Sequence, residues 1–441
     1  MSINCSHVHL AAVPRQWVDE GPSVFKTLNL ERNNIREIND GDFFGVKIER
    51  LLLANNSLSE LKFLSFWGLE HSLETLDLSY NNFRKIPSEA LRLLMSLRSL
   101  SLTGNQITSL HDFDFAYMRK LEVLALDKNP ISSVSRQSLV GTKLSLLILD
   151  SIRLKDQLQD LTTDEMKYVK GLSLSHNKIR SIPTEWFRNV KYLRYLNLGN
   201  NLIVSISSTA FVGLEEPLRT LELHHNHLTQ MPVDAVRRLL NLETLDLSHN
   251  RIRRIYRRAF NASAALQSLD LSHNRIHKMS KRAFVGLNSV QKIDLRYNHL
   301  ITLDDRTFPW SNPKGRLVYL SDNPWLCNCI LKWVKDEAQR QTDLATIFAD
   351  DLVCDRPQIL HGWSLMEVPD IDLSCDHDYY YYYSDEDTGE GHQVEGQEHD
   401  DDDDDDEENN EDGDVVKHDE LNQPHSVEES KLSQNNSRKL I

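Results

Sequence analysis

The chain has 441 residues, a formal net charge of −16 and a pI near 5.6, with 40% hydrophobic and 26% charged residues. No stretch approaches 18 consecutive apolar residues, so the sequence as given predicts no membrane-spanning helix. No pattern fits a nucleophile with its base, a phosphate-binding glycine loop or a metalloprotease helix. We therefore expect no enzyme activity and no cofactor.

One pattern, L-x-L-x-x-N-x-L, recurs along the chain at intervals of 23 to 25 residues. Its asparagine slot falls at Asn33, Asn56, Asn81, Asn105, Asn129, Ile152, Asn177, Asn201, Asn226, Asn250, Asn274, Asn298 and Asn323. This period is typical of a leucine-rich repeat solenoid. Leucines that alternate with polar residues indicate a short strand with one buried face. The predicted fold class is an α/β leucine-rich repeat solenoid, with a curved parallel sheet and short irregular or helical convex segments.

A solenoid presents a long concave face and has no enclosed cleft, so the repeats predict a protein ligand on the concave sheet. The sixth repeat departs from the pattern, because Ile152 stands where asparagine belongs. The charged stretch from Lys155 to Lys170 suggests a helical turn or bulge on the convex side. This repeat is either degenerate, or a hinge or partner site halfway along the arc.

A cysteine-containing segment follows the repeats, with Cys327, Cys329, Cys354 and Cys375. Four cysteines allow three disulfide connectivities, and a zinc site is a competing interpretation that the long, irregular gaps disfavour. The order N-P-W-x-C-x-C…W…C…P…L-x-G…C resembles the cysteine-rich C-terminal flanking cap of extracellular leucine-rich repeat proteins. The resemblance implies a disulfide cap with the pairs Cys327–Cys354 and Cys329–Cys375.

The start of the chain, around Cys5, looks like the last part of a matching N-terminal cap. Earlier cap cysteines and a signal peptide are absent from this sequence, so we expect a truncated start; the alternative is a leftover thiol. The disulfide cap predicts an oxidising, extracellular compartment. Sequons at Asn55 and Asn261 predict glycosylation and add weak support.

The net charge is divided between two unlike parts of the chain. From Asp376 onward there are 24 acidic and four basic residues, against 42 acidic and 46 basic residues before it. A segment so charged and so poor in aliphatic residues is expected to be disordered. Tyrosines among carboxylates predict sulfation at Tyr379, Tyr380, Tyr381, Tyr382 and Tyr383. A merely solvating tail and weak calcium binding by its carboxylates are the alternatives.

Basic residues recur one repeat apart in the later repeats and form a predicted anion-binding stripe. Arg254 matches Lys278, Arg257 matches Lys281, and Arg258 matches Arg282. Because these residues follow the strand and its turn, the stripe should cross the loops or the convex side. Stacked like charges favour a counter-ion, either a glycosaminoglycan, a sulfated partner or the chain's own acidic tail, although a solvated face is the simpler alternative. Nucleic acid does not suit a secreted protein with this net charge.

Two titratable rows are expected on the concave side. His225, His249 and His273 form one row, and Asp246, Asp270 and Asp294 form the other. A pH-sensitive face and a cation site are both hypotheses for such rows. These residues are also ordinary solvent-facing positions of the repeat, and we predict no metal site.

The sequence predicts four parts: a partial N-terminal cap at residues 1–25, repeats at 26–322, a cysteine-rich cap at 323–375 and a disordered acidic tail at 376–441. The layout resembles small leucine-rich matrix proteins and platelet glycoprotein Ib alpha-like ectodomains, which implies a secreted or cell-surface binding protein of matrix or adhesion type. One alternative is a receptor ectodomain without its membrane segment. Another is an intracellular acidic leucine-rich repeat protein that acts as a chaperone or phosphatase regulator, which the cysteine cap disfavours.

Overall fold

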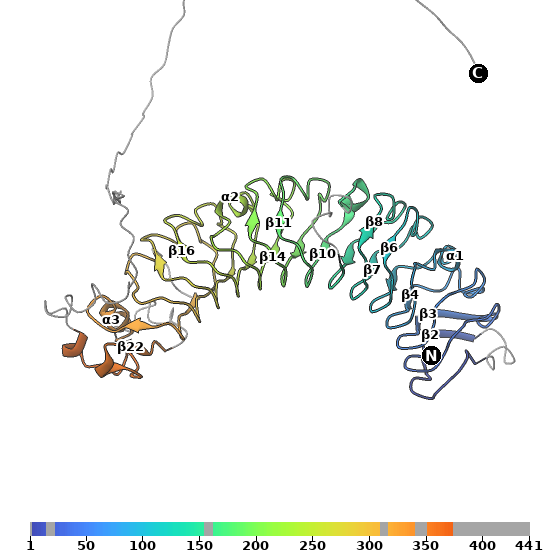
Figure 1. The fold of residues 1–441 in the computed structure, drawn as a ribbon, viewed down its shortest axis with the longest axis horizontal. Coiled ribbons are helices and arrows are strands. Elements are labelled where there is room, and N and C mark those ends of the chain that lie inside the picture. The colour runs from blue at the N-terminus through green and yellow to red at the C-terminus, as the bar shows by residue number, and fades with distance from the viewer. Residues whose placement is uncertain (1, 15–22, 154–161, 309–315, 340–350, 374–441) are drawn as a thin grey trace, which may run out of the picture. The chain divides into compact units, whose positions relative to one another are not determined.

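A computed structural model describes residues 2–14, 23–153, 162–308, 316–339 and 351–373. The chain divides into two units, Met1–Tyr379 and Tyr380–Ile441, and the second unit lies outside the described residues. The first unit is a curved stack of repeats (Figure 1).

One parallel sheet of 14 strands lines the inner side of the curve. In sheet order the strands are β1 (Ser2–Asn4), β2 (Ser23–Asn29), β3 (Val46–Leu52), β4 (Thr75–Asp77), β5 (Ser99–Ser101), β7 (Val123–Ala125), β9 (Leu146–Ile148), β10 (Gly171–Ser173), β12 (Tyr195–Asn197), β14 (Thr220–Glu222), β15 (Thr244–Asp246), β17 (Ser268–Asp270), β19 (Lys292–Asp294) and β20 (Leu317–Tyr319). Each strand pairs with its counterpart one repeat away, as Leu245 does with Leu269. This arrangement confirms the predicted fold class.

Short elements complete the outer side of the repeats. They are the two-stranded pairs β6 (Ser109–Leu110) with β8 (Ser133–Val134), β11 (Ser181–Ile182) with β13 (Ser205–Ile206) and β16 (Arg254–Ile255) with β18 (Lys278–Met279), the helices α1 (Ser88–Leu91) and α2 (Val233–Val236), and the 3₁₀ helix η3 (Asp164–Tyr168). The helical turn expected after the sixth repeat is present as η3, while residues 154–161 lie outside the described part.

The core lies between the sheet and the outer segments. The central leucines of the strands, such as Leu245, are fully buried, and an outer layer of phenylalanines stacks between neighbouring repeats. Ring centroids are 6.0 Å apart for Phe187 and Phe211 and 5.7 Å apart for Phe260 and Phe284. Neighbouring strands in a sheet lie only about 4.8 Å apart. The outer layer is therefore spaced more widely than the inner one, which accounts for the curve with the sheet on its concave side.

The repeat asparagines form a buried hydrogen-bonded ladder between repeats. Asn274 Oδ1 accepts the N–H of Ile252 at 3.0 Å, and its Nδ2 donates to the carbonyls of Leu247 and Leu271 at 2.9 and 3.1 Å. The other asparagines repeat this pattern, as the need to satisfy turn backbone groups predicts. Ile152 replaces one of them with a buried apolar side chain, 3% exposed.

The segment after the repeats contains β21 (Trp325–Leu326), α3 (Lys332–Gln339), β22 (Cys354–Arg356), η4 (Gln358–Leu360) and η5 (Asp370–Leu373). Trp325 is fully buried, and its Nε1 donates to the carbonyl of Leu320 at 3.1 Å. The buried Lys335 donates to the carbonyl of Val368 and to Asp370. These contacts close the C-terminal end of the core.

Candidate binding surfaces

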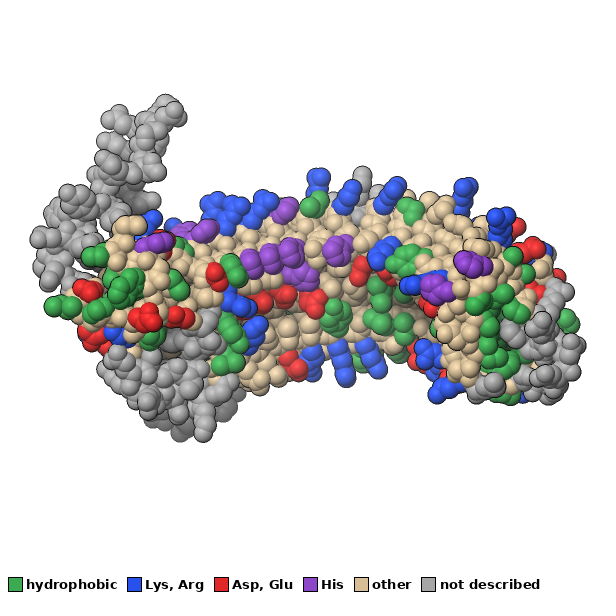
Figure 2. All heavy atoms as spheres, turned by 90° about the horizontal axis from the view of Figure 1, so that it is seen from below, with side chains coloured by type: hydrophobic (Ala, Val, Ile, Leu, Met, Phe, Trp, Pro, Cys, Tyr) green, Lys and Arg blue, Asp and Glu red, His purple; other side chains and the backbone are tan. Residues whose placement is uncertain are grey.

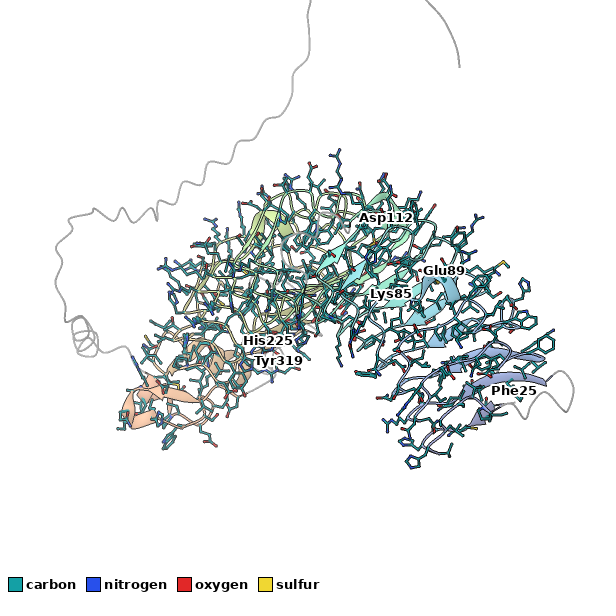
Figure 3. All side chains as sticks on the ribbon, turned by 45° about the vertical axis from the view of Figure 1, so that its right-hand side comes forward. Phe25, Lys85, Glu89, Asp112, His225 and Tyr319 are labelled. Atoms are coloured by element: carbon teal, nitrogen blue, oxygen red, sulfur yellow. A yellow bond between two sulfur atoms is a disulfide. The ribbon has the colours of Figure 1, made fainter. Side chains whose placement is uncertain are left out.

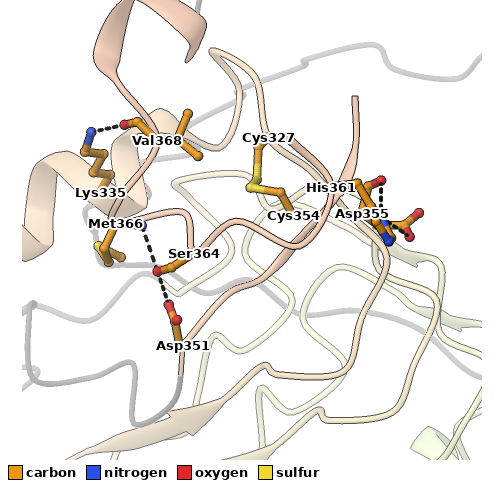
Figure 4. Close-up of a disulfide and its surroundings, with 9 residues drawn as sticks. All are labelled: Cys327, Lys335, Asp351, Cys354, Asp355, His361, Ser364, Met366 and Val368. Atoms are coloured by element: carbon orange, nitrogen blue, oxygen red, sulfur yellow. Dashed lines mark hydrogen bonds and ion pairs between the residues drawn. A yellow bond between two sulfur atoms is a disulfide. The ribbon is translucent and has the colours of Figure 1, made fainter. Parts of the chain in front are cut away.

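The disulfide implied by the resemblance is present at the C-terminal end. Cys327 and Cys354 are bonded, with Cα atoms 5.6 Å apart (Figure 4). Cys329 is also disulfide-bonded, and its expected partner, Cys375, lies outside the described residues. Cys5 is a free thiol that packs against the edge of the core. The pair Cys327–Cys354 is thus confirmed, and Cys329–Cys375 stays a prediction.

An apolar patch lies on the concave face at the fifth and sixth repeats. β7 and β9 turn Leu124 and Leu147 inward and leave the alternate residues partly exposed. Those outward residues are Val123, Ala125, Leu146 and Ile148, and they stand directly opposite one another across the two strands. The next strand offers Gly171, over which the Leu146 side chain lies, because a Cβ there would come within 2.8 Å of Leu146 Cδ1. The repeat pattern alone does not predict this patch, although the apolar run L-S-L-L-I-L from Leu144 to Leu149 signals it.

Polar groups surround the patch toward the C-terminal side. Tyr195 donates a hydrogen bond to Glu222 Oε2 at 3.0 Å. Burial and the neighbouring Glu222 charge raise the pKa of Tyr195 to about 12. The concave face therefore places half-buried apolar side chains beside an ordered polar network.

The predicted aspartate row is present, and its members have different partners. Asp246 Oδ2 lies 3.4 Å from His224 Nδ1, and this contact raises the pKa of His224. Asp294 is buried and paired with Arg296 and Lys292 at 2.6 and 3.4 Å. Burial acts to raise the pKa of Asp294, but the hydrogen bonds and charges of Arg296 and Lys292 outweigh it and lower that pKa. No group of His, Cys, Asp or Glu suited to a metal ion occurs among the described residues.

The predicted histidine row is also present, and its rings are stacked. His225 and Tyr319 lie on the inner side of the curve, whereas Asp112 lies on its outer side (Figure 3). Figure 2 shows the histidines as a band along the concave face, with Asp and Glu next to one edge of the band and Lys and Arg further out on both sides.

The basic stripe falls on the loops and outer side, as expected from its position after the strands. Arg254 pairs with Lys278 in the register of β16 and β18. The backbone N–H of Arg258 donates to the carbonyl of Arg282 at 3.2 Å, so these residues also lie one repeat apart in one column. Arg257 and Lys281 are exposed like the other four. The structure therefore brings all three predicted pairs together on neighbouring repeats.

A cavity of about 550 Å³ adjoins this stripe. It is lined by Thr229, Gln230, Arg253, Arg254, Tyr256 and His277, with no carboxylate in the lining. The predicted glycosylation residues Asn55 and Asn261 are exposed. The predicted sulfation residues Tyr379 to Tyr383 lie outside the described part. No helix in the described ranges is long and apolar enough to cross a bilayer.

These surfaces lie on a solenoid scaffold of leucine-rich repeats. The leucine-rich repeat description matches residues 46–107, 95–154, 167–216, 216–276 and 264–324, which make up more than half of the chain. The protein belongs to the leucine-rich repeat family.

Three known proteins illustrate its relationships. Mouse podocan is 33% identical over 217 residues, covering 48% of this chain and 34% of podocan. Mouse osteomodulin is 30% identical over 234 residues, covering 47% of this chain and 52% of osteomodulin. Human Toll-like receptor 3 is 27% identical over 230 residues, covering 51% of this chain and 23% of the receptor. The matched region is thus about a quarter to a half of the length of these relatives.

The fold is also that of a solved structure, the Drosophila Toll–Spatzle complex. The TM-score is 0.62 at 24% sequence identity, and the match covers 83% of this chain and 54% of the solved one. At that identity the likeness concerns the fold alone.

Proposed function

We propose that this protein is a secreted or cell-surface binding protein of matrix or adhesion type, and that its concave sheet binds a protein partner. The observation that carries the proposal is the apolar patch of Val123, Ala125, Leu146 and Ile148 on β7 and β9. Protein interfaces are centred on apolar side chains within a polar rim, and this patch has that composition. Half of the patch lies on the sixth repeat, so it favours a partner site there over a merely degenerate repeat.

A matched pair of variants tests the concave site. The variant Val123→Lys/Ile148→Lys places two charges in the patch, and Val24→Lys/Val204→Lys places two charges at valines that are 66% and 57% exposed elsewhere. Binding to decellularised matrix and adhesion of cells to the immobilised protein should fall at least tenfold for the patch variant only. Equal binding by the two variants would exclude the patch as the partner site.

The extracellular location is supported by the Cys327–Cys354 bond, since disulfides persist in oxidising compartments. Intact mass of the protein secreted from animal cells, before and after reduction, tests it. We expect two disulfides, glycans at Asn55 and Asn261, and sulfate mass increments on the peptide that contains Tyr379 to Tyr383. Free thiols and an unmodified mass would favour the intracellular alternative.

The basic stripe is proposed as a binding surface for a sulfated glycosaminoglycan. Three other repeats carry an acidic residue that pairs with an arginine three positions on, as in Glu89–Arg92, Glu185–Arg188 and Asp234–Arg237. The same repeat position is occupied by Arg258 and Arg282. The stripe therefore gains cations where other repeats have carboxylates. None of its six basic side chains forms an ion pair with another described residue.

Heparin chromatography tests the stripe. The variant Arg254→Ala/Lys278→Ala should elute at clearly lower salt than wild type, because each lost cation weakens a screened electrostatic contact. The control Arg84→Ala/Lys85→Ala removes the same two residue types from an exposed site in an earlier repeat. Identical elution of both variants would exclude the stripe.

The acidic tail is proposed as a second binding element, on the basis of its charge alone. If its carboxylates compete with heparin for the stripe, deletion of residues 376–441 should raise heparin affinity at low salt more than at high salt. Equal retention with and without the tail would exclude the competition. Weak calcium binding by the tail would appear as calcium retention that the same deletion abolishes.

A receptor ectodomain is the second candidate function, supported by the match to human Toll-like receptor 3. Joined to a supplied membrane anchor and a cytoplasmic reporter, a receptor ectodomain should produce a partner-dependent signal. A matrix protein should instead be retained in the extracellular matrix.

A further inference from the structure

Four aromatic rings form a continuous stack along one edge of the concave face. They belong to His225, His249, His273 and Tyr297, which occupy the position before the ladder asparagine in four consecutive repeats. Successive ring centroids are 3.9, 4.1 and 4.2 Å apart, with interplanar angles of 11, 9 and 10°. These spacings place each imidazole in face-to-face contact with the next ring. We call this stack the histidine ladder.

The backbone holds the ladder in place. His225, His249 and His273 have positive φ angles of 51, 53 and 52°. Their N–H groups donate to carbonyls of the following repeat, at 3.0 Å to Ser248, 3.0 Å to Ser272 and 2.9 Å to Arg296 respectively. The Cα atoms of the three histidines therefore stay in register as long as the repeats stay stacked.

Charged residues lie on both sides of the ladder positions in each repeat, and Asp246 and Asp270 act electrostatically on the ladder histidines. On the sheet side are Glu222, Asp246 and Asp270, with His224 paired to Asp246 and Asp294 paired to Arg296. On the side that follows the asparagines are Arg251 and Arg275, each two residues after a ladder histidine, together with His227 and His299. His176 acts on His225 from the repeats before it.

The surroundings of His225 and His249 lower the pKa of both histidines in the free protein, which disfavours their protonation. Burial lowers the pKa of His225, and the neighbouring His224 lowers it further. Burial also lowers the pKa of His249, which stands between His225 and His273. An anion placed along the Arg251 and Arg275 edge would offset the repulsion between charged rings and make protonation easier.

We propose that the histidine ladder is a proton-dependent extension of the basic surface, and that it strengthens the capture of a sulfated polysaccharide in acidic surroundings. Near neutral pH the ladder is uncharged and the polysaccharide contacts only the arginines and lysines of the adjoining loops. As the pH falls, the ladder histidines beside the bound polysaccharide take up protons, and a cationic band then reaches onto the concave face. The inference rests on the proposed glycosaminoglycan binding and adds its regulation.

Titration calorimetry with a heparin-derived octasaccharide tests the proposal on the full chain. At constant ionic strength the affinity should rise about tenfold between pH 7.5 and 5.5, because an average uptake of about half a proton on binding, acting over two pH units, gives that change by linkage. Measurements at pH 6 in two buffers of different ionisation enthalpy should show net proton uptake on binding.

The variant His225→Asn/His249→Asn/His273→Asn should bind as wild type does at pH 7.5 and lose most of the pH dependence. Asparagine suits the site because Asn200 occupies the same repeat position at a φ of 53°. The control His7→Asn/His9→Asn/His71→Asn removes three exposed histidines from the first repeats and should keep the full pH dependence.

The possible failures are distinguishable. Absence of octasaccharide binding at every pH would overturn both the proposed glycosaminoglycan function and this inference. Binding with the same affinity at pH 7.5 and 5.5, or without proton uptake by the wild-type protein, would overturn this inference alone. An unchanged pH dependence in the ladder variant would also overturn it, because the protons would then be bound elsewhere.

Discussion

Each buried repeat asparagine should contribute several kcal/mol to the free energy of unfolding. The adjacent residues Asn81 and Asn82 provide a matched test. Asn81 is 5% exposed; its Oδ1 accepts the N–H of Leu58 at 2.9 Å, and its Nδ2 donates to the carbonyls of Leu53 and Leu78 at 3.0 and 3.1 Å. Asn81→Ala leaves these three buried backbone groups, and the carbonyl of Ser79 at 3.2 Å, without this partner. Each costs about 1–3 kcal/mol, and partial compensation between them gives an expected loss of about 3–6 kcal/mol.

Asn82 is the control, because it is the next residue, has the same type and is exposed. Its side chain makes one long contact, 3.5 Å from Gln106 Nε2, so Asn82→Ala should change stability by less than about 0.5 kcal/mol. Urea unfolding followed by circular dichroism measures both variants. A difference in unfolding free energy between the two variants below about 1 kcal/mol would refute the structural role assigned to the repeat asparagines.

Three further predictions concern stability. Cys327→Ala/Cys354→Ala opens a loop of 27 residues and should cost about 3.5 kcal/mol by the loop-entropy estimate, measured by thermal unfolding. Gly286→Ala should cost more than Gly41→Ala by about 1–3 kcal/mol in urea unfolding, because both have positive φ but only at Gly286 would a Cβ lie 2.4 Å from a carbonyl oxygen, that of Phe260. Burial and neighbouring histidines lower the pKa of His249 in the folded protein. Its contribution to the free energy of unfolding is therefore fully present above the unfolded pKa of 6.5 and declines as the pH falls below that value. His249→Asn should reduce the loss of unfolding free energy between pH 7 and 5, and an unchanged pH profile would contradict this.

The constant repeat length made much of the fold predictable. Because Arg254 and Lys278 are 24 residues apart, as are His249 and His273, a single register places both pairs side by side. The role of the asparagines followed from the need to satisfy turn backbone groups, and Asn274 confirms it. The pair Cys327–Cys354 came from resemblance and not from spacing.

Other features depend on side-chain conformation or on comparing repeats column by column. The histidine row was foreseen, but face-to-face stacking of its rings depends on rotamers that a sequence does not specify. The apolar patch could not be predicted from alternation, because Leu146 and Ile148 belong to an apolar run in which buried and exposed positions have the same residue types. Arg258 and Arg282 stand at the repeat position where Glu89 and Glu185 place a carboxylate. This exchange of charge is visible only once the repeats are aligned.

The most direct test of the account measures how the protein is released from extracellular matrix by increasing salt. Two independent surfaces predict two components: one that salt weakens, through the basic stripe, and one that resists salt, through the concave patch. Arg254→Ala/Lys278→Ala should remove only the salt-sensitive component, and Val123→Lys/Ile148→Lys should remove only the salt-resistant one. Loss of both components in either variant, or of neither in both, would contradict binding through two separate faces.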